Sequence, residues 1–184
     1  HRLRAHQTAR IWAVPPEGWR GAAFDDGSWA RMQGPFLIGE YRTPQHAYRS
    51  VPMVCLRGRF RVDDPARAKG LTLSAAYHGG IAVYVNGNEL LRQHLPEGEL
   101  KPDTLATPYP DQAFFDKDGY LLWGRKADEK MTARIAERLR RLERVEIPAS
   151  MLRKGINVLA IELHRAPAHE GMFMRKAKAM RWNI

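Results

Sequence analysis

The chain of 184 residues has almost no cysteine, no long apolar run and a shortage of acidic charge. Cys55 is the only cysteine, so the chain can form neither an internal disulfide nor a cysteine-rich zinc site. No apolar run approaches the ~18 residues that a membrane-spanning helix needs. No glycine-rich phosphate loop follows an expected strand, and Asn86-Gly87-Asn88 is too short for one. A disulfide-held scaffold, a transmembrane helix and a nucleotide-binding loop are therefore excluded.

The charge is strongly basic, with 30 Lys and Arg against 20 Asp and Glu and a net charge of +10. Such an excess makes nucleic acid, an acidic polysaccharide or an anionic surface a candidate partner. The basic residues are spread along the chain instead of forming one run. Nucleic-acid binding would want basic residues interleaved with exposed aromatics. Because the expected helix has none, acidic glycan or plain solubility is favoured over nucleic acid.

The length fits one domain, and 44% apolar residues supply enough material for a core. The first residue is His1, and no signal-peptide pattern is visible in the first residues. We therefore expect residues 1–184 to form a single domain excised from a longer protein.

Several segments alternate apolar and polar residues with the period of a half-buried strand. In 53–62 one face carries Val54, Leu56, Phe60 and Val62, and the other Cys55, Arg57, Arg59 and Arg61. Further strands are expected at 9–14, 71–77, 81–85, 89–92, 145–147, 158–164 and 178–184. Asn86-Gly87 between apolar runs predicts a tight hairpin, since both residues tolerate positive φ.

Residues 97–143 look like an insertion, with a helix expected at about 126–143. The helix is indicated by one apolar stripe, made by Ala127, Met131, Ile135, Leu139 and Leu142. Strands do not alternate with helices elsewhere, which argues against a parallel α/β sheet. The predicted fold class is all-β: an antiparallel β-sandwich of jelly-roll type with one inserted α-helix.

Several segments, in this order, resemble the galactose-binding-like jelly-roll domains. They are Phe24-Asp25-Asp26-Gly27-Ser28-Trp29, Arg57-Gly58-Arg59-Phe60-Arg61-Val62-Asp63-Asp64-Pro65, Leu71-Thr72-Leu73-Ser74, Val83-Tyr84-Val85-Asn86-Gly87-Asn88-Glu89-Leu90, Ile147-Pro148-Ala149-Ser150-Met151-Leu152 and Gly155-Ile156-Asn157-Val158-Leu159-Ala160-Ile161-Glu162-Leu163-His164. Such domains occur as accessory carbohydrate-binding modules, as the sugar-binding domain of family 2 glycoside hydrolases, and in secreted proteins of planctomycete type.

The resemblance implies a non-catalytic carbohydrate-binding or accessory module of a larger secreted or periplasmic bacterial protein. In these domains loops at one edge of the sandwich hold the ligand, and a structural calcium ion often accompanies the fold. No other cofactor is implied. The partners expected are a glycan or a neighbouring domain of the parent protein.

The insertion is the expected ligand site because it concentrates aromatic residues outside the strands. Sugars stack on aromatic rings while polar groups bind their hydroxyls. The candidates are Tyr109, Tyr120, Trp123 and Arg125, and Trp123 beside Arg125 suits an acidic sugar. The competing interpretation is a satellite core, which with Phe114 and Phe115 pins the helix to the sandwich.

No pattern predicts a catalytic residue. Asp25-Asp26 and Asp116-x-Asp118 are more typical of turns than of paired catalytic carboxylates or a calcium loop. His164 and His169-Glu170 lack the spacing of a zinc-binding helix, and we expect His164 to face solvent or to be hydrogen-bonded. We therefore expect no enzyme activity, and the sequence leaves the metal content open.

Two sets of arginines could bind anionic groups. One is Arg57, Arg59 and Arg61 on a strand, and the other is Arg134, Arg138 and Arg141 on the expected helix. The simpler interpretation is a solvated face balanced by Glu129, Glu137 and Glu143. The same surfaces support an alternative function, a structural or protein-interaction domain without affinity for sugar.

Overall fold

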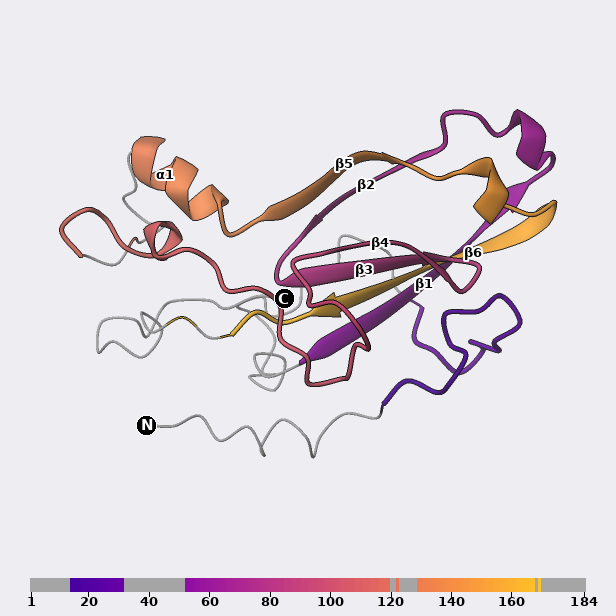
Figure 1. Cartoon of the computed structure of the whole chain (residues 1–184), viewed down its shortest axis with the longest axis horizontal. Helices are drawn as coiled ribbons and strands as arrows, with labels where there is room; N and C mark the ends of the chain where they lie inside the picture. The colour runs from indigo at the N-terminus through magenta and orange to yellow at the C-terminus, as the bar shows by residue number, and fades with distance from the viewer. Residues whose placement is uncertain (1–13, 32–51, 120–121, 123–128, 168, 170–184) are drawn as a thin grey trace.

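The structure, a computed structural model, describes residues 14–31, 52–119, 122, 129–167 and 169. These residues form mostly antiparallel β-strands with little helix, so the expected all-β class is confirmed (Figure 1). The strands are β1 (Met53–Val62), β2 (Thr72–Tyr77), β3 (Gly80–Val85), β4 (Asn88–Gln93), β5 (Arg140–Glu146) and β6 (Gly155–His164). The helical elements are α1 (Glu129–Ala136) and the 3-10 turns η3 (Pro65–Arg67), η4 (Asp111–Ala113) and η5 (Ala149–Met151).

The strands make a four-stranded sheet in the order β1-β6-β3-β4 and a two-stranded sheet of β2 and β5. The two sheets are seen as separate layers in Figure 1, and side chains from both meet between them. This core contains Tyr77, Ile81, Val83 and Leu142, with Leu73, Ala75, Leu90, Leu91, Val145, Leu159, Ile161 and Leu163 packed around them. Every residue of β3 is buried, as expected of an inner strand that is covered on both faces.

The strands expected in 53–92 and 158–164 are confirmed within a few residues at each end. The hairpin between β3 and β4 is confirmed too, since Asn86 has φ of 53° and Gly87 has φ of 91°. These are the positive angles that a type I′ turn requires. The strand expected at 178–184 lies outside the described residues. So does the strand expected at 9–14, apart from Val14.

The helix expected at about 126–143 is wrong in its extent. Within the described residues α1 ends at Ala136, and residues 140–146 form β5, which pairs antiparallel with β2. A bulge explains why the strand pattern is hidden: Arg144 has φ of 50°, and the register shifts between Leu73 and Ala75 of β2. The extra residue breaks the period-two alternation that would have indicated a strand. Because β5 begins at Arg140, the end of the expected insertion is part of the two-stranded sheet.

The other face of the four-stranded sheet is covered by residues 14–31. Trp19 is buried against Ala82, Tyr84 and Ala160 of the sheet, and Phe24 and Trp29 pack around it. The rings of Trp19 and Trp29 stack with their centroids 5.7 Å apart. Residues 14–31 are therefore held to the sheet by aromatic anchors.

Candidate ligand-binding sites

Of the four predicted site residues, only Tyr109 lies within the described part of the chain. Its side chain is 7% exposed, and its hydroxyl accepts a hydrogen bond of 2.7 Å from the backbone N–H of Gly79. The Arg140 guanidinium lies 4.0 Å from the centre of the ring, and Phe114 meets the ring edge-on. The Tyr109 ring is thus occupied by packing in this structure. Tyr120, Trp123 and Arg125 lie outside the described residues.

The aromatics of the insertion that the structure describes form a satellite core. Tyr109 and Phe114 are buried together with Ala106, Ala113 and Ala166, and Phe115 packs against them. The imidazole of His169 stacks on Phe114 with a centroid distance of 4.0 Å. For these rings the packing role that competes with sugar binding is observed.

The arginines of the helical region bind backbone carbonyl groups. Arg134 donates to the carbonyl groups of Gln112 and Phe115, and Arg138 donates to that of Ala113 at 2.8 Å. Arg140 donates to Gly79 at 2.6 Å and to two carbonyl groups of the loop before η4, those of Thr107 and Pro108. Arg134 and Arg138 thus join two parts of the insertion, and Arg140 of β5 holds the loop before η4 to the sheets. Arg141 lies on β5, so the expected helical surface of Arg134, Arg138 and Arg141 is wrong.

The arginine face of β1 is solvated only in part, because the side chain of Arg57 is buried whereas those of Arg59 and Arg61 are exposed. Arg57 is 2% exposed, and its Nε donates to the Asp26 carboxylate at 3.0 Å. Its Nη1 donates to the carbonyl groups of Trp19 and Gly21. Asp26 is 1% exposed, and the hydrogen bond from Arg57 lowers the pKa of its carboxyl against the opposing effect of burial. Arg57 thus ties residues 14–31 to the sheet.

A second buried ionic group lies on the same face of the sheet. Glu162 accepts a hydrogen bond of 3.0 Å from Arg20 Nε, and its other oxygen lies 2.8 Å from His164 Nε2. Burial alone would raise the pKa of Glu162, but the bonds and charges of His164 and Arg20 outweigh burial and lower it. His164 also contacts the carbonyl oxygen of Thr104 at 2.9 Å and is fully buried. The expectation that His164 is hydrogen-bonded is confirmed.

No metal or nucleophile site emerges from the described residues. Asp25 Oδ1 accepts from the N–H of Gly27 and Asp116 Oδ1 from that of Asp118, each at 2.9 Å, as expected of turns. Among the described residues no group of three or more His, Cys, Asp or Glu could hold a metal ion. Burial raises the pKa of the Cys55 thiol to about 12, which keeps it protonated and unreactive at neutral pH.

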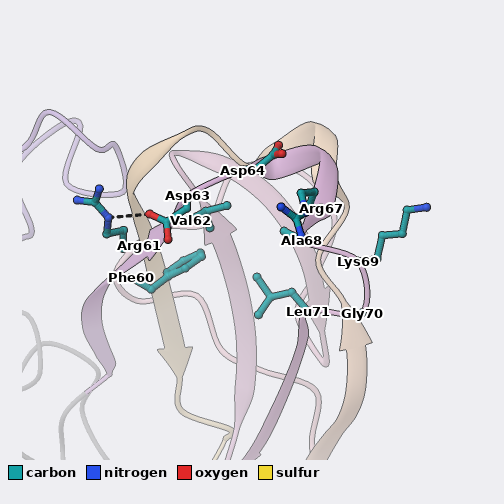
Figure 2. A pocket seen from close by; sticks show the side chains of 10 residues that line it. All are labelled: Phe60, Arg61, Val62, Asp63, Asp64, Arg67, Ala68, Lys69, Gly70 and Leu71. Atoms are coloured by element: carbon teal, nitrogen blue, oxygen red, sulfur yellow. Dashed lines mark hydrogen bonds and ion pairs between the residues drawn. The ribbon is translucent and has the colours of Figure 1, made fainter.

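A pocket of about 530 Å³ opens between the end of β1, η3 and the start of β2 (Figure 2). Phe60, Val62, Ala68 and Leu71 give it an apolar lining, and Arg61, Asp63, Asp64, Arg67, Lys69 and Gly70 complete it. The turn at its rim is fixed because Asp64 Oδ1 caps η3 by accepting from the N–H of Ala66 at 3.0 Å. Gly70, with φ of 78°, supports the bend that leads into β2.

Two cations of this pocket lack an acidic partner among the described residues. Arg61 donates to Asp63 at 2.9 Å, whereas the exposed Arg67 and Lys69 have no ion pair in the described part of the chain. In Figure 2 Arg67 lies on the η3 turn and Lys69 extends outward from the rim. The sequence pattern did not predict this pocket. Its signal in the sequence is the pair of cations Arg67 and Lys69, two residues apart in the connection that follows the strand expected at 53–62.

Within the described residues, no helix is both long and apolar enough to cross a membrane. No protein-family model matches the chain, and no curated protein or solved structure matches it.

Proposed function

We propose that this chain is a non-catalytic, accessory carbohydrate-binding module of the galactose-binding-like jelly-roll type, and that it binds an acidic glycan. The observation that carries the proposal is the pocket between β1, η3 and β2. The elements that line it meet at one end of the two sheets, where loops connect the strands (Figure 1). Loops held by a rigid scaffold are the usual position for binding residues.

The chemistry of the pocket suits a sugar acid. Phe60 and Leu71, both partly exposed, offer apolar surface to the ring face of a sugar, and such contacts are common in carbohydrate sites. Arg67 presents a guanidinium fork that matches the two oxygens of a carboxylate. Lys69 adds a second charge at the rim. An apolar floor beneath two cations that form no ion pair with the described residues favours a uronate over a neutral sugar.

The alternative, a protein-interaction domain without affinity for sugar, assigned its contacts to the two arginine surfaces. In the structure Arg57 is buried against Asp26, and Arg134 and Arg138 bind carbonyl groups of the insertion. These three guanidinium groups are therefore not offered to a partner, whereas Arg59 and Arg61 stay exposed on β1. We prefer the glycan-binding function because the η3 pocket combines an apolar lining with cations. As an accessory module, the domain would serve within a larger secreted or periplasmic protein.

The test is isothermal titration of the protein with oligogalacturonate and with neutral galacto-oligosaccharide at physiological ionic strength. The expected result is saturable binding of the uronate alone. The double variant Arg67→Ala and Lys69→Ala should lose uronate binding without a change in thermal stability, since both side chains are exposed. Lys154→Ala, which removes an exposed charge outside the pocket lining, is the matched control and should bind normally.

Two results would contradict the proposal. Absence of binding to every glycan tested would favour the interaction domain. Equal loss of binding in the control variant would mean that only the net charge attracts the polymer.

A further inference from the structure

Three arginines converge on the single carboxylate of Asp26. Arg57 Nε donates to Oδ2 at 3.0 Å, while Arg31 Nη2 and Arg59 Nη2 both donate to Oδ1, at 2.9 and 2.7 Å. One negative charge thus faces three positive ones. Two positive charges remain uncompensated by any ion pair within the described residues.

The three guanidinium groups differ in how many of their hydrogen-bond donors are used within the described residues. The side chain of Arg57 is buried, and its Nη1 and Nη2 groups donate to the carbonyl groups of Trp19, Gly21 and Phe24. The side chains of Arg31 and Arg59 are 66% and 50% exposed. Each uses only Nη2 in the hydrogen bonds of the described residues, so the Nε and Nη1 donors of both are available to a ligand.

The two exposed guanidinium groups are also held close together. Because both Nη2 atoms bond to the same oxygen, their separation cannot exceed the two bonds laid end to end. Asp26 itself is buried and fixed by Arg57, and Arg59 projects from β1, the outer strand of the sheet. The donors are therefore positioned before any ligand arrives, which reduces the conformational entropy lost on binding.

We infer that Arg31 and Arg59 together form a binding site for a tetrahedral oxyanion, the group carried by a sulfate or phosphate ester. The Asp26 carboxylate already accepts one Nη2 bond from each of the two exposed arginines, so a second acceptor has to reach the Nε and Nη1 donors that remain on two separate segments. A planar carboxylate can be satisfied by one guanidinium fork, whereas a tetrahedral anion can bridge both. The site is separate from the pocket at η3, since neither arginine lines that pocket.

The experiment is a titration with inorganic sulfate, inorganic phosphate and acetate at constant ionic strength, followed by isothermal calorimetry and by the chemical shifts of arginine side chains. Sulfate or phosphate should saturate one site, and Arg31→Ala or Arg59→Ala should each weaken binding about tenfold, the loss of one charge-assisted contact. The double variant should not bind measurably. The tighter of the two anions identifies the ester.

Arg61→Ala is the matched control, because it removes an exposed arginine of the same strand whose partner is Asp63. It should bind the anion normally, as should the double variant at Arg67 and Lys69 that tests the proposed glycan site. Arg59→Lys keeps the charge without the guanidinium fork and should still weaken binding, which separates geometry from charge. No saturation at any site, equal affinity for acetate, or binding retained in the Arg31 and Arg59 double variant would each overturn the assignment.

Discussion

The imidazole Nε2 of His164 lies 2.8 Å from Oε1 of Glu162, and both side chains are essentially fully buried. The carbonyl oxygen of Thr104 can only accept, so His164 Nδ1 donates that bond. With Nδ1 as the donor, a neutral imidazole carries no proton on Nε2, and an ionised carboxylate carries none on Oε1. The contact between these two atoms therefore requires one further proton, which lies between them. The contact is a charge-assisted bond near the end of β6, and Arg20 completes it from the covering segment 14–31.

This relationship predicts different costs for two substitutions of Glu162. Glu162→Gln keeps an oxygen for Arg20 and offers an amide N–H to neutral His164, so it should cost only about 1 kcal/mol of unfolding free energy. Glu162→Ala leaves both partners without an acceptor and should cost about 3 kcal/mol or more. Urea denaturation measures both.

Asp63→Ala serves as the control for that comparison. It breaks the exposed ion pair with Arg61 and should cost less than about 1 kcal/mol. Equal costs for the glutamine and alanine variants of Glu162 would show that the two bonds do not stabilise the fold.

His78 predicts a dependence of stability on pH. Burial lowers its pKa, and the charges of Arg138 and Arg140 lower it further, against a hydrogen bond to the Arg138 carbonyl that raises it. The unfolded chain therefore takes up a proton below about pH 6.5 where the folded chain resists it, and stability falls as the pH drops through that range.

The measurement is the unfolding free energy of the wild type and of His78→Asn between pH 7.5 and about 5, with the unperturbed histidine pKa near 6.5 inside the range. Asparagine keeps a donor for the carbonyl but does not titrate. The advantage of the wild type should shrink as the pH falls. Two parallel profiles would contradict the assignment.

Two substitutions of Asn86 should separate the stability cost of backbone strain from that of lost hydrogen bonds. Its side chain donates to Asn157 at 2.8 Å and to the Met151 carbonyl at 2.9 Å, and it accepts from the N–H of Val158. Asn86→Gly removes these bonds but tolerates the φ of 53°, so it should cost about 2 kcal/mol. Asn86→Ala adds about 1 kcal/mol of left-handed strain. The reverse order of thermal stability would contradict the turn geometry.

We predict that the hydrogen bonds and stacking of the Arg140 guanidinium, and not its charge alone, hold the insertion to the sheet. It stacks on Tyr109 and donates to three carbonyl groups. Arg140→Lys cannot reproduce this set, so amide hydrogen exchange should increase across residues 104–115 while β3 and β6 stay protected. Exposed Arg141→Lys is the control and should leave exchange unchanged. Unchanged protection in both variants would show that Arg140 does not hold the loop.

The strand β1 could be predicted because apolar and polar side chains alternate along it with a period of two. Val54, Leu56, Phe60 and Val62 share one face, with Gly58 at the remaining position of that face. The strand β5 could not, because the bulge at Arg144 breaks its alternation, and Leu139 and Leu142 extend the apparent helical stripe.

The roles of the arginines were beyond prediction from sequence for a different reason. Arg57 bonds to Asp26, Trp19 and Gly21, which lie more than thirty residues away, and Arg140 bonds to Gly79 across sixty-one. Most of these partners are backbone carbonyl groups, which carry no compositional signal. Much of the positive charge that indicates an anionic partner therefore serves the fold, and Arg67 and Lys69 are the cations left for a ligand at the η3 pocket.

Binding of an acidic glycan at the η3 pocket is tested most directly by titrating isotope-labelled protein with oligogalacturonate and following backbone amide shifts. Saturable shifts are expected in the pocket lining, residues 60–64 and 67–71, and they should be lost in the Arg67→Ala and Lys69→Ala double variant. Saturation with shifts confined to another surface, or no shift at all, would contradict it.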